Sequence, residues 1–154
     1  MRDSLKHMRA LVVDDLALMR DLLRHILLAV GVGRVDTAVD GGEALAAFYR
    51  SPADVIFVDW QMEPMSGIEF LQAVRRSVKS PNPYVPIIMV TSHADRRHII
   101  EARDAGVHEY IVKPITAQAV LSRLSAVINN RRPFLRTETF FGPAPRQNLP
   151  QIAG

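Results

Sequence analysis

The chain has 154 residues, of which 48% are hydrophobic, so its length and composition fit one globular domain with a sizeable core. It has no cysteine, which excludes disulfides, thiolate metal sites and cysteine nucleophiles and suits a cytoplasmic protein, and its apolar runs are too short for a membrane span or a signal peptide. The 19 basic and 16 acidic residues give a net charge of +3, but residues 1–130 hold 15 of each sign and show no basic excess for nucleic acid.

The chain alternates between predicted strands and predicted helices. Short β-branched runs predict the strands, whereas apolar residues at helical spacing predict the helices. In chain order we predict a strand at residues 10–13, a helix at 16–30, a strand at 35–38, a helix at 42–49, a strand at 55–58, a helix at 67–78, a strand at 87–90, a helix at 94–105, a strand at 110–112 and a helix at 116–129. The first, third and fourth strands are almost continuously apolar, which is typical of parallel strands buried on both faces. Five strand–helix units therefore predict an α/β fold in which helices cover both faces of a sheet.

The composition changes after Asn130. Residues 131–154 contain four prolines, three phenylalanines and the whole net positive charge, and they are too few for a core of their own. We therefore expect a domain over residues 8–130 and a tail over residues 131–154. The tail either docks on the chain's own surface, on a second copy or on an acidic partner, or forms a disordered, solvating extension.

Polar side chains follow four of the five predicted strands. They are Asp14 and Asp15 after the first strand, Asp59 at the end of the third, Thr91 after the fourth and Lys113 after the fifth. Because the carboxyl ends of parallel strands meet at one edge, we expect these groups to gather there. Two carboxylates about 4 Å apart repel by roughly 4 kcal/mol at an effective dielectric of 20, and Mg²⁺ turns that repulsion into attraction. The set can therefore hold a divalent metal and receive a phosphoryl group on Asp59.

Each of these residues has a simpler explanation when it is considered alone. An acid pair suits a helix start, an aspartate suits a turn, a threonine caps a helix and a lysine before proline is ordinarily a surface residue. Their joint occurrence at four strand ends, in this order, favours one shared site.

The five histidines do not predict a metal site. Four of them have no metal-ligand spacing with one another, namely His7, His25, His98 and His108. His93 follows Thr91 by two residues, at the mouth of the predicted site. It either contacts the water that hydrolyses an acyl phosphate or is a solvated loop residue.

These motifs resemble the receiver domain of two-component response regulators, of the chemotaxis-regulator type, over about residues 8–130. The matching positions are the acid pair Asp14-Asp15, the phosphoacceptor Asp59, the switch hydroxyl Thr91, the rotating aromatic Tyr110 and the lysine–proline signature Lys113-Pro114. The step of 44 residues from Asp15 to Asp59 and that of 22 from Thr91 to Lys113 also match the family's pattern.

One position departs from the family. Glu63 stands where the family usually has proline, and Pro64 follows it. Gly67 keeps its register, so we expect a locally altered loop and a working site.

The resemblance implies a doubly wound, flavodoxin-like sheet with strand order 2-1-3-4-5, and it implies roles for the site residues. The implied Mg²⁺ ligands are Asp15, Asp59 and the backbone carbonyl of Gln61 directly, and Asp14 through water. Lys113 and Thr91 would contact phosphoryl oxygens, after which Thr91 would turn toward the phosphate and Tyr110 would move inward. These movements would bias a face formed by helix four, strand five and helix five.

The implied partners are a histidine kinase or a phosphotransfer protein as donor and a downstream target protein on the switching face. A homodimer is a further option, and neither nucleic acid nor a membrane is expected as a partner. The protein would be a cytoplasmic signalling receiver with self-catalysed phosphorylation and slow autodephosphorylation, and not an enzyme.

Two other functions compete with this interpretation. A Mg²⁺-dependent phosphatase with an aspartyl nucleophile usually carries a second aspartate two residues later as general acid, and here that position is Gln61. A flavin carrier of the same fold needs a first loop rich in serine, threonine and glycine to hold phosphate, whereas Asp14 and Asp15 would repel it. A DNA-binding regulator would need a further domain, which 24 tail residues cannot supply.

Overall fold

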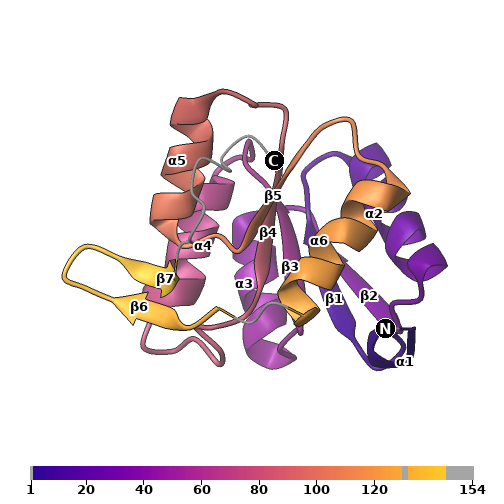
Figure 1. Cartoon of the computed structure of the whole chain (residues 1–154), viewed down its shortest axis with the longest axis horizontal. Coiled ribbons are helices and arrows are strands. Elements are labelled where there is room, and N and C mark those ends of the chain that lie inside the picture. Colours follow the sequence, from indigo (N-terminus) through magenta and orange to yellow (C-terminus); the bar gives the residue numbers. More distant parts are fainter. Residues whose placement is uncertain (1, 130–131, 145–154) are drawn as a thin grey trace.

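The computed structural model describes residues 2–129 and 132–144 of the chain (Figure 1). Five parallel strands form one sheet in the order β2-β1-β3-β4-β5, which confirms the predicted α/β fold and the order that the resemblance implied. The strands are β1 (Arg9–Val13), β2 (Arg34–Ala38), β3 (Val55–Asp59), β4 (Ile87–Thr91) and β5 (Glu109–Val112). The helices are α1 (Arg2–Leu5), α2 (Ala17–Val30), α3 (Gly41–Arg50), α4 (Gly67–Arg76), α5 (Arg96–Ala105) and α6 (Ala117–Asn129).

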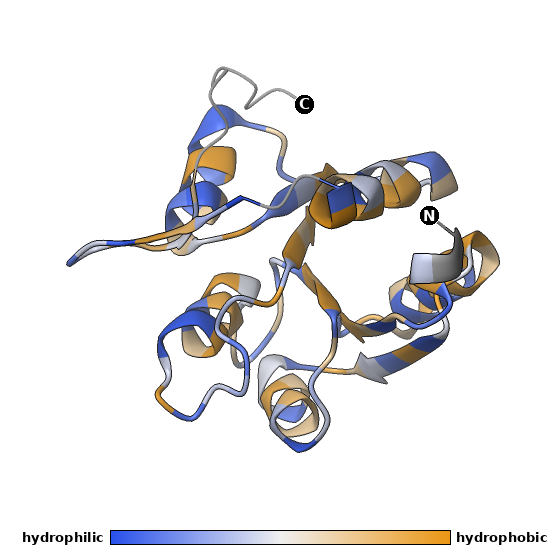
Figure 2. Cartoon of the chain, turned by 60° about the horizontal axis from the view of Figure 1, so that its bottom comes forward, coloured by the Kyte–Doolittle hydropathy of each residue, from blue (hydrophilic) through white to orange (hydrophobic). Residues whose placement is uncertain are grey.

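Helices cover both faces of the sheet, as Figures 1 and 2 show. Side chains alternate between the two faces along each strand, so sequence neighbours enter different cores. Val13 and Val58 pack with residues of α3, α4 and α5, whereas Val12 and Phe57 pack with residues of α2 and α6. Within residues 2–129 and 132–144, no helix combines the length and apolar character that crossing a membrane requires.

Helix ends lie close to their predicted positions, and capping side chains explain them. Gly31 ends α2 with a φ of 112°, in the left-handed region that glycine adopts readily. α5 begins at Arg96, two residues later than predicted, because the side chain of Asp95 is its N-cap and accepts the backbone N–H of His98.

A β-hairpin follows α6, where the sequence analysis predicted no regular structure. Its strands are β6 (Phe134–Arg136) and β7 (Phe141–Pro143), which pair antiparallel and pack beside α4 and α5 (Figure 1). The ring of Tyr84 makes edge contacts with Phe134 and Phe141, at centroid distances of 5.0 and 5.6 Å. The tail therefore docks on the chain's own surface over residues 132–144, one of the options left open above; the rest of it lies outside the described residues.

A buried arginine of α4 holds this corner together. Arg75 is 1% exposed, and it donates hydrogen bonds to the carbonyls of Gly106, Pro83 and Val85 at 3.0, 2.8 and 2.7 Å. Its third nitrogen lies 3.0 Å from Nδ1 of His108, and its guanidinium lies 5.1 Å from the ring centre of Phe134. Burial lowers the pKa of Arg75 to about 9, and burial with the nearby arginine charges lowers the pKa of His108 to about 2. His108 is thus a neutral acceptor that contacts β4 and the hairpin, whereas Arg75 bonds the loop before β4.

Candidate functional site

The sheet brings the three predicted carboxylates together at its carboxyl edge. Asp14 and Asp15 follow β1, Asp59 ends β3, and one carboxylate oxygen from each lies within 4.8 Å of the other two. Asp14 and Asp59 are only 5% and 6% exposed, whereas Asp15 is open to solvent. The structure therefore forms a compact acidic cluster with one accessible and two buried members.

Lys113 reaches the same cluster from the end of β5. Its Nζ lies 3.5 Å from Oδ1 of Asp59, and its backbone N–H donates to the carbonyl of Thr91 at 2.8 Å. Burial, followed by the charge of Asp14, raises the pKa of Asp59 to about 6, although Lys113 acts in the opposite direction. Burial also raises the pKa of Asp14, partly offset by a hydrogen bond from the backbone N–H of Leu16 at 2.9 Å. One lysine does not compensate the buried carboxylates, so the cluster favours additional positive charge.

The residue set fits a divalent cation that prefers oxygen. Three carboxylates within 4.8 Å of one another are ligands suited to Mg²⁺. Burial is the main cause of the raised pKa of Asp59 and repulsion from Asp14 adds to it, and a cation would favour the ionised carboxylate against both. The loop after Asp59 supplies the candidate carbonyl of Gln61, and a hollow of about 460 Å³ beside it is lined by Asp15, Trp60, Gln61, Met62, Glu63 and Ser66.

The loop after Asp59 requires glycine at its end. A Cβ atom on Gly67 would lie 2.3 Å from the carbonyl oxygen of Asp59, and the backbone N–H of Gly67 donates to the carbonyl of Trp60 at 2.9 Å. The close approach explains why glycine keeps its register here. Glu63 and Pro64, where the sequence departs from the family, are exposed in this loop.

Thr91 and Tyr110 are joined through the backbone of His93. Oγ1 of the buried Thr91 accepts the N–H of His93 at 3.1 Å, and the Tyr110 hydroxyl donates to the carbonyl of His93 at 2.5 Å. Tyr110 packs against the core, and burial raises its pKa to about 12. The two predicted switch residues therefore contact one peptide segment, and Tyr110 is half-buried.

A second cluster was missed by the sequence analysis. His93, Asp95 and His98 each offer one ligand atom, and these atoms lie within 4.8 Å of one another. His93 was considered separately from the other four histidines, and its closeness to His98 depends on the loop that leads into the first turn of α5. The available signal was an N-cap aspartate between two histidines five residues apart.

Comparisons with known proteins agree with this geometry. A family model described as the response regulator receiver domain matches residues 10–125. The chemotaxis protein CheY of Pseudomonas aeruginosa is 38% identical over 120 residues, which are 78% of this chain and 95% of that protein. CheY-3 of Vibrio cholerae is 36% identical over 122 residues, which are 79% of this chain and 92% of that protein.

Solved structures show the same similarity. The chemotaxis response regulator CheY4 of Vibrio cholerae superposes with a TM-score of 0.71 at 34% identity, covering 78% of this chain and 98% of that one. A chain of the CheX-CheY-BeF3-Mg²⁺ complex from Borrelia burgdorferi superposes with a TM-score of 0.72 at 26% identity, covering 83% of this chain and 94% of that one.

Proposed function

The chain belongs to the response regulator receiver domain family, and we propose that it takes a phosphoryl group from a histidine kinase or a phosphotransfer protein onto Asp59. It is a receiver of the CheY type, a phospho-accepting protein of two-component signalling. The observation that carries the proposal is the position of Asp59, which is buried at the end of β3 beside Asp14 and Asp15 and 3.5 Å from Lys113.

In the proposed reaction a carboxylate oxygen of Asp59 attacks the donor phosphorus. The new bond joins that oxygen to phosphorus, and the bond from phosphorus to the donor breaks, which leaves the electron pair on the donor. Mg²⁺, held by Asp14, Asp15, Asp59 and the carbonyl of Gln61, would supply the positive charge that an anionic donor needs near these carboxylates. Lys113 would neutralise charge on a phosphoryl oxygen, and phosphoryl transfer needs little beyond such positioning and neutralisation. The chain would therefore catalyse its own phosphorylation and, slowly, its own dephosphorylation.

Phosphorylation would then be transmitted through Thr91 and Tyr110. The Thr91 hydroxyl would turn from the N–H of His93 to the phosphoryl group, which releases one of the two contacts on that peptide segment. The face that would respond is formed by α5, β5 and α6, and its output would be contact with a target protein or a second copy of the chain. The receiver unit would span residues 8–130, with residues 131–154 as an extension, and the protein would act in the cytoplasm.

The phosphatase alternative lacks its acid. Gln61 stands where the general acid would be, and its amide nitrogen lies 3.0 Å from Nε2 of His93. The matched family and relatives give this alternative no support. The structural relative that is described with BeF3 and Mg²⁺ supports the receiver chemistry instead.

Incubation with acetyl phosphate and Mg²⁺, followed by intact mass measurement, tests the proposed function. One phosphoryl group should add about 80 Da. A chain that gains no mass with either this small donor or a phosphorylated kinase fragment would exclude the proposed chemistry.

Mg²⁺ binding should change the fluorescence of Trp60, which adjoins Asp59, and should weaken as the pH falls through about 6. The pKa of Asp59 is raised to about 6, so below that pH protons compete with the metal for its carboxylate. Affinity should drop by up to about tenfold per pH unit there. Asp15→Asn should weaken binding more than Asp14→Asn, since Asp15 is the proposed direct ligand. Titrations at pH 5, 6 and 8 measure this, and an affinity independent of pH would contradict it.

Thr91→Ala should separate phosphorylation from switching. The variant keeps Asp59, Lys113 and the acid pair, so acetyl phosphate should label it to within about twofold of the wild type. It lacks the hydroxyl that the phosphoryl group would attract, so residues 92–98 should no longer change their hydrogen exchange on phosphorylation. Thr116→Ala, at the start of α6, serves as a threonine control. A normal exchange response in Thr91→Ala would remove Thr91 from the switch.

A further inference from the structure

We propose that His93, Asp95 and His98 form a second metal site, which binds a divalent transition metal ion of the Cu²⁺, Ni²⁺ or Zn²⁺ type. The site lies in the loop between β4 and α5 and in the first turn of α5, and it shares no side chain with the acidic cluster.

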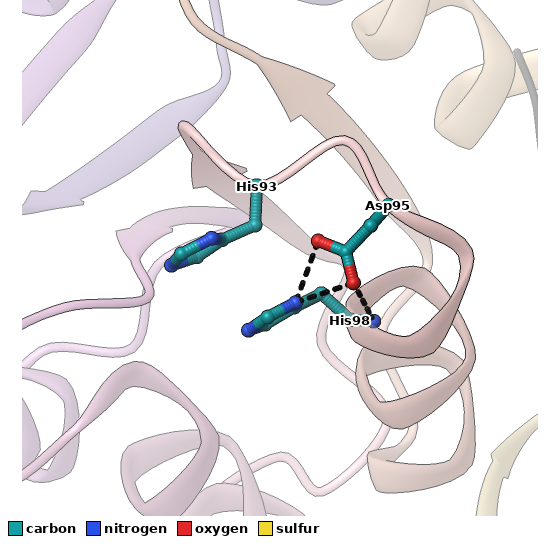
Figure 3. Close-up of side chains that lie close together, drawn as sticks. All are labelled: His93, Asp95 and His98. Carbon is teal, nitrogen blue, oxygen red and sulfur yellow. Dashed lines mark hydrogen bonds and ion pairs between the residues drawn. The ribbon is translucent and has the colours of Figure 1, made fainter.

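The three side chains already lie together (Figure 3). Nδ1 of His98 lies 2.7 and 2.8 Å from the two carboxylate oxygens of Asp95. The ring of His93 stacks on the ring of His98, with centroids 3.9 Å apart and 5° between their planes. Two imidazoles and one carboxylate therefore lie side by side at the start of a helix, with one ligand atom from each within 4.8 Å of the others.

The ligand chemistry separates this site from the acidic cluster. Two imidazole nitrogens and a carboxylate suit copper, nickel and zinc, whereas Mg²⁺ prefers oxygen ligands and keeps several waters. Asp14, Asp15 and Asp59 offer only oxygen atoms. The two clusters should therefore select different ions when both ions are present.

Neighbouring groups preorganise the two histidines. The amide nitrogen of Gln61 lies 3.0 Å from Nε2 of His93, which leaves Nδ1 as the ring nitrogen of His93 that we assign to the metal. When the metal replaces the proton on Nδ1, the proton moves to Nε2 and the Gln61 amide turns to accept it through its oxygen, the outer-shell contact typical of metal-bound histidine. Trp60 packs edge-on against both rings, with centroids 6.3 Å from His93 and 5.1 Å from His98.

Metal binding requires the three side chains to rearrange. The nitrogen lone pair lies in the plane of each ring, so two parallel rings must tilt before both can point at one ion. Ligand atoms around a tetrahedral ion lie about 3.3 Å apart for metal–nitrogen bonds of about 2.0 Å, and here they lie within 4.8 Å. Both rings and the Asp95 carboxylate are partly or fully exposed, so they can close this gap by side-chain rotation.

The test is a titration of the full chain with Cu²⁺ in excess Mg²⁺, followed by the fluorescence of Trp60. Trp60 is the single tryptophan of the chain, and it contacts both proposed ligands, so bound Cu²⁺ should quench it at one equivalent. Zn²⁺, which does not quench by itself, should restore the signal only in large excess, because such a site binds Cu²⁺ more tightly than Zn²⁺. Native mass spectrometry gives the stoichiometry independently.

Variants decide whether these residues bind the ion. His93→Gln and His98→Gln should each weaken Cu²⁺ binding by at least about tenfold, and Asp95→Asn by a smaller factor. His25→Gln is the matched control, because His25 is an exposed histidine of α2 and should leave the affinity unchanged. Circular dichroism checks that each variant is folded. Wild-type affinity in both histidine variants, or no saturable quenching in the wild type, would overturn the proposal whether or not Asp59 accepts phosphate.

Discussion

Asp59→Asn should remove all of the roughly 80 Da adduct that acetyl phosphate and Mg²⁺ leave on the chain. An amide oxygen is a poor nucleophile toward phosphorus, and the variant cannot form the acyl phosphate. The rest of the site should persist, because asparagine has the same shape and the carboxylate it replaces is buried with a raised pKa. Intact mass spectrometry and peptide mapping measure the result.

Asp54→Asn is the control for this experiment. Asp54 precedes the other end of β3, where it is exposed and accepts the backbone N–H of Arg9 at 2.8 Å. Its substitution should leave the labelling intact. If the Asp59→Asn chain gained as much mass as the wild type, the phosphoryl group would reside elsewhere, and the role assigned to Asp59 would be wrong.

Arg75→Ala should destabilise the protein by at least about 4 kcal/mol. The substitution leaves three carbonyls without the guanidinium donor, and a buried group that loses its partner costs about 1–3 kcal/mol. It also empties a buried volume between α4 and the hairpin. For a chain of this size the melting temperature should fall by roughly 10 °C or more. Urea denaturation followed by circular dichroism measures the free energy of unfolding.

Arg76→Ala provides the matched control, because Arg76 is the exposed neighbour whose hydrogen bond to the carbonyl of Thr139 lies at the surface. Its loss should cost less than about 1 kcal/mol. Arg75→Lys keeps a positive charge but cannot reproduce the forked set of donors, so it should recover little of the stability. Equal unfolding curves for Arg75→Ala and Arg76→Ala would show that the buried contacts contribute nothing.

The parts of the molecule that follow local rules were predictable. Strands β1, β3 and β4 are buried on both faces and therefore appear in the sequence as apolar runs. The polar residues that follow the strands predicted that Asp14, Asp59 and Lys113 lie together at one edge of the sheet. Glycine and cap residues fixed most helix ends to within two residues.

The features that were missed depend on contacts between distant segments. Arg75 lies in the last turn of α4, directly after the apolar residue Val74. Arginine is rarely a core residue, so the sequence did not predict that Arg75 is buried or that it donates to three carbonyls of other segments. The hairpin was missed for the same reason, since its short strands gain their stability from α4, Tyr84 and Arg75. The stacking of His93 on His98 depends on the course of a loop, which periodicity does not describe.

His93 connects the proposed metal site to the proposed switch, and the two should oppose each other. Its backbone N–H donates to the Thr91 hydroxyl, and its carbonyl accepts from the Tyr110 hydroxyl. Its imidazole is part of the proposed transition-metal site. An ion bound to the imidazole would hold the backbone in the position where its N–H donates to Thr91, so it would disfavour the proposed turn of Thr91 toward an acyl phosphate. Thermodynamic linkage makes the antagonism mutual: phosphorylation should loosen the ion by the same factor by which the ion opposes phosphorylation. The receiver would then respond to two inputs, because a higher concentration of the metal ion would require more phosphoryl donor for the same degree of phosphorylation.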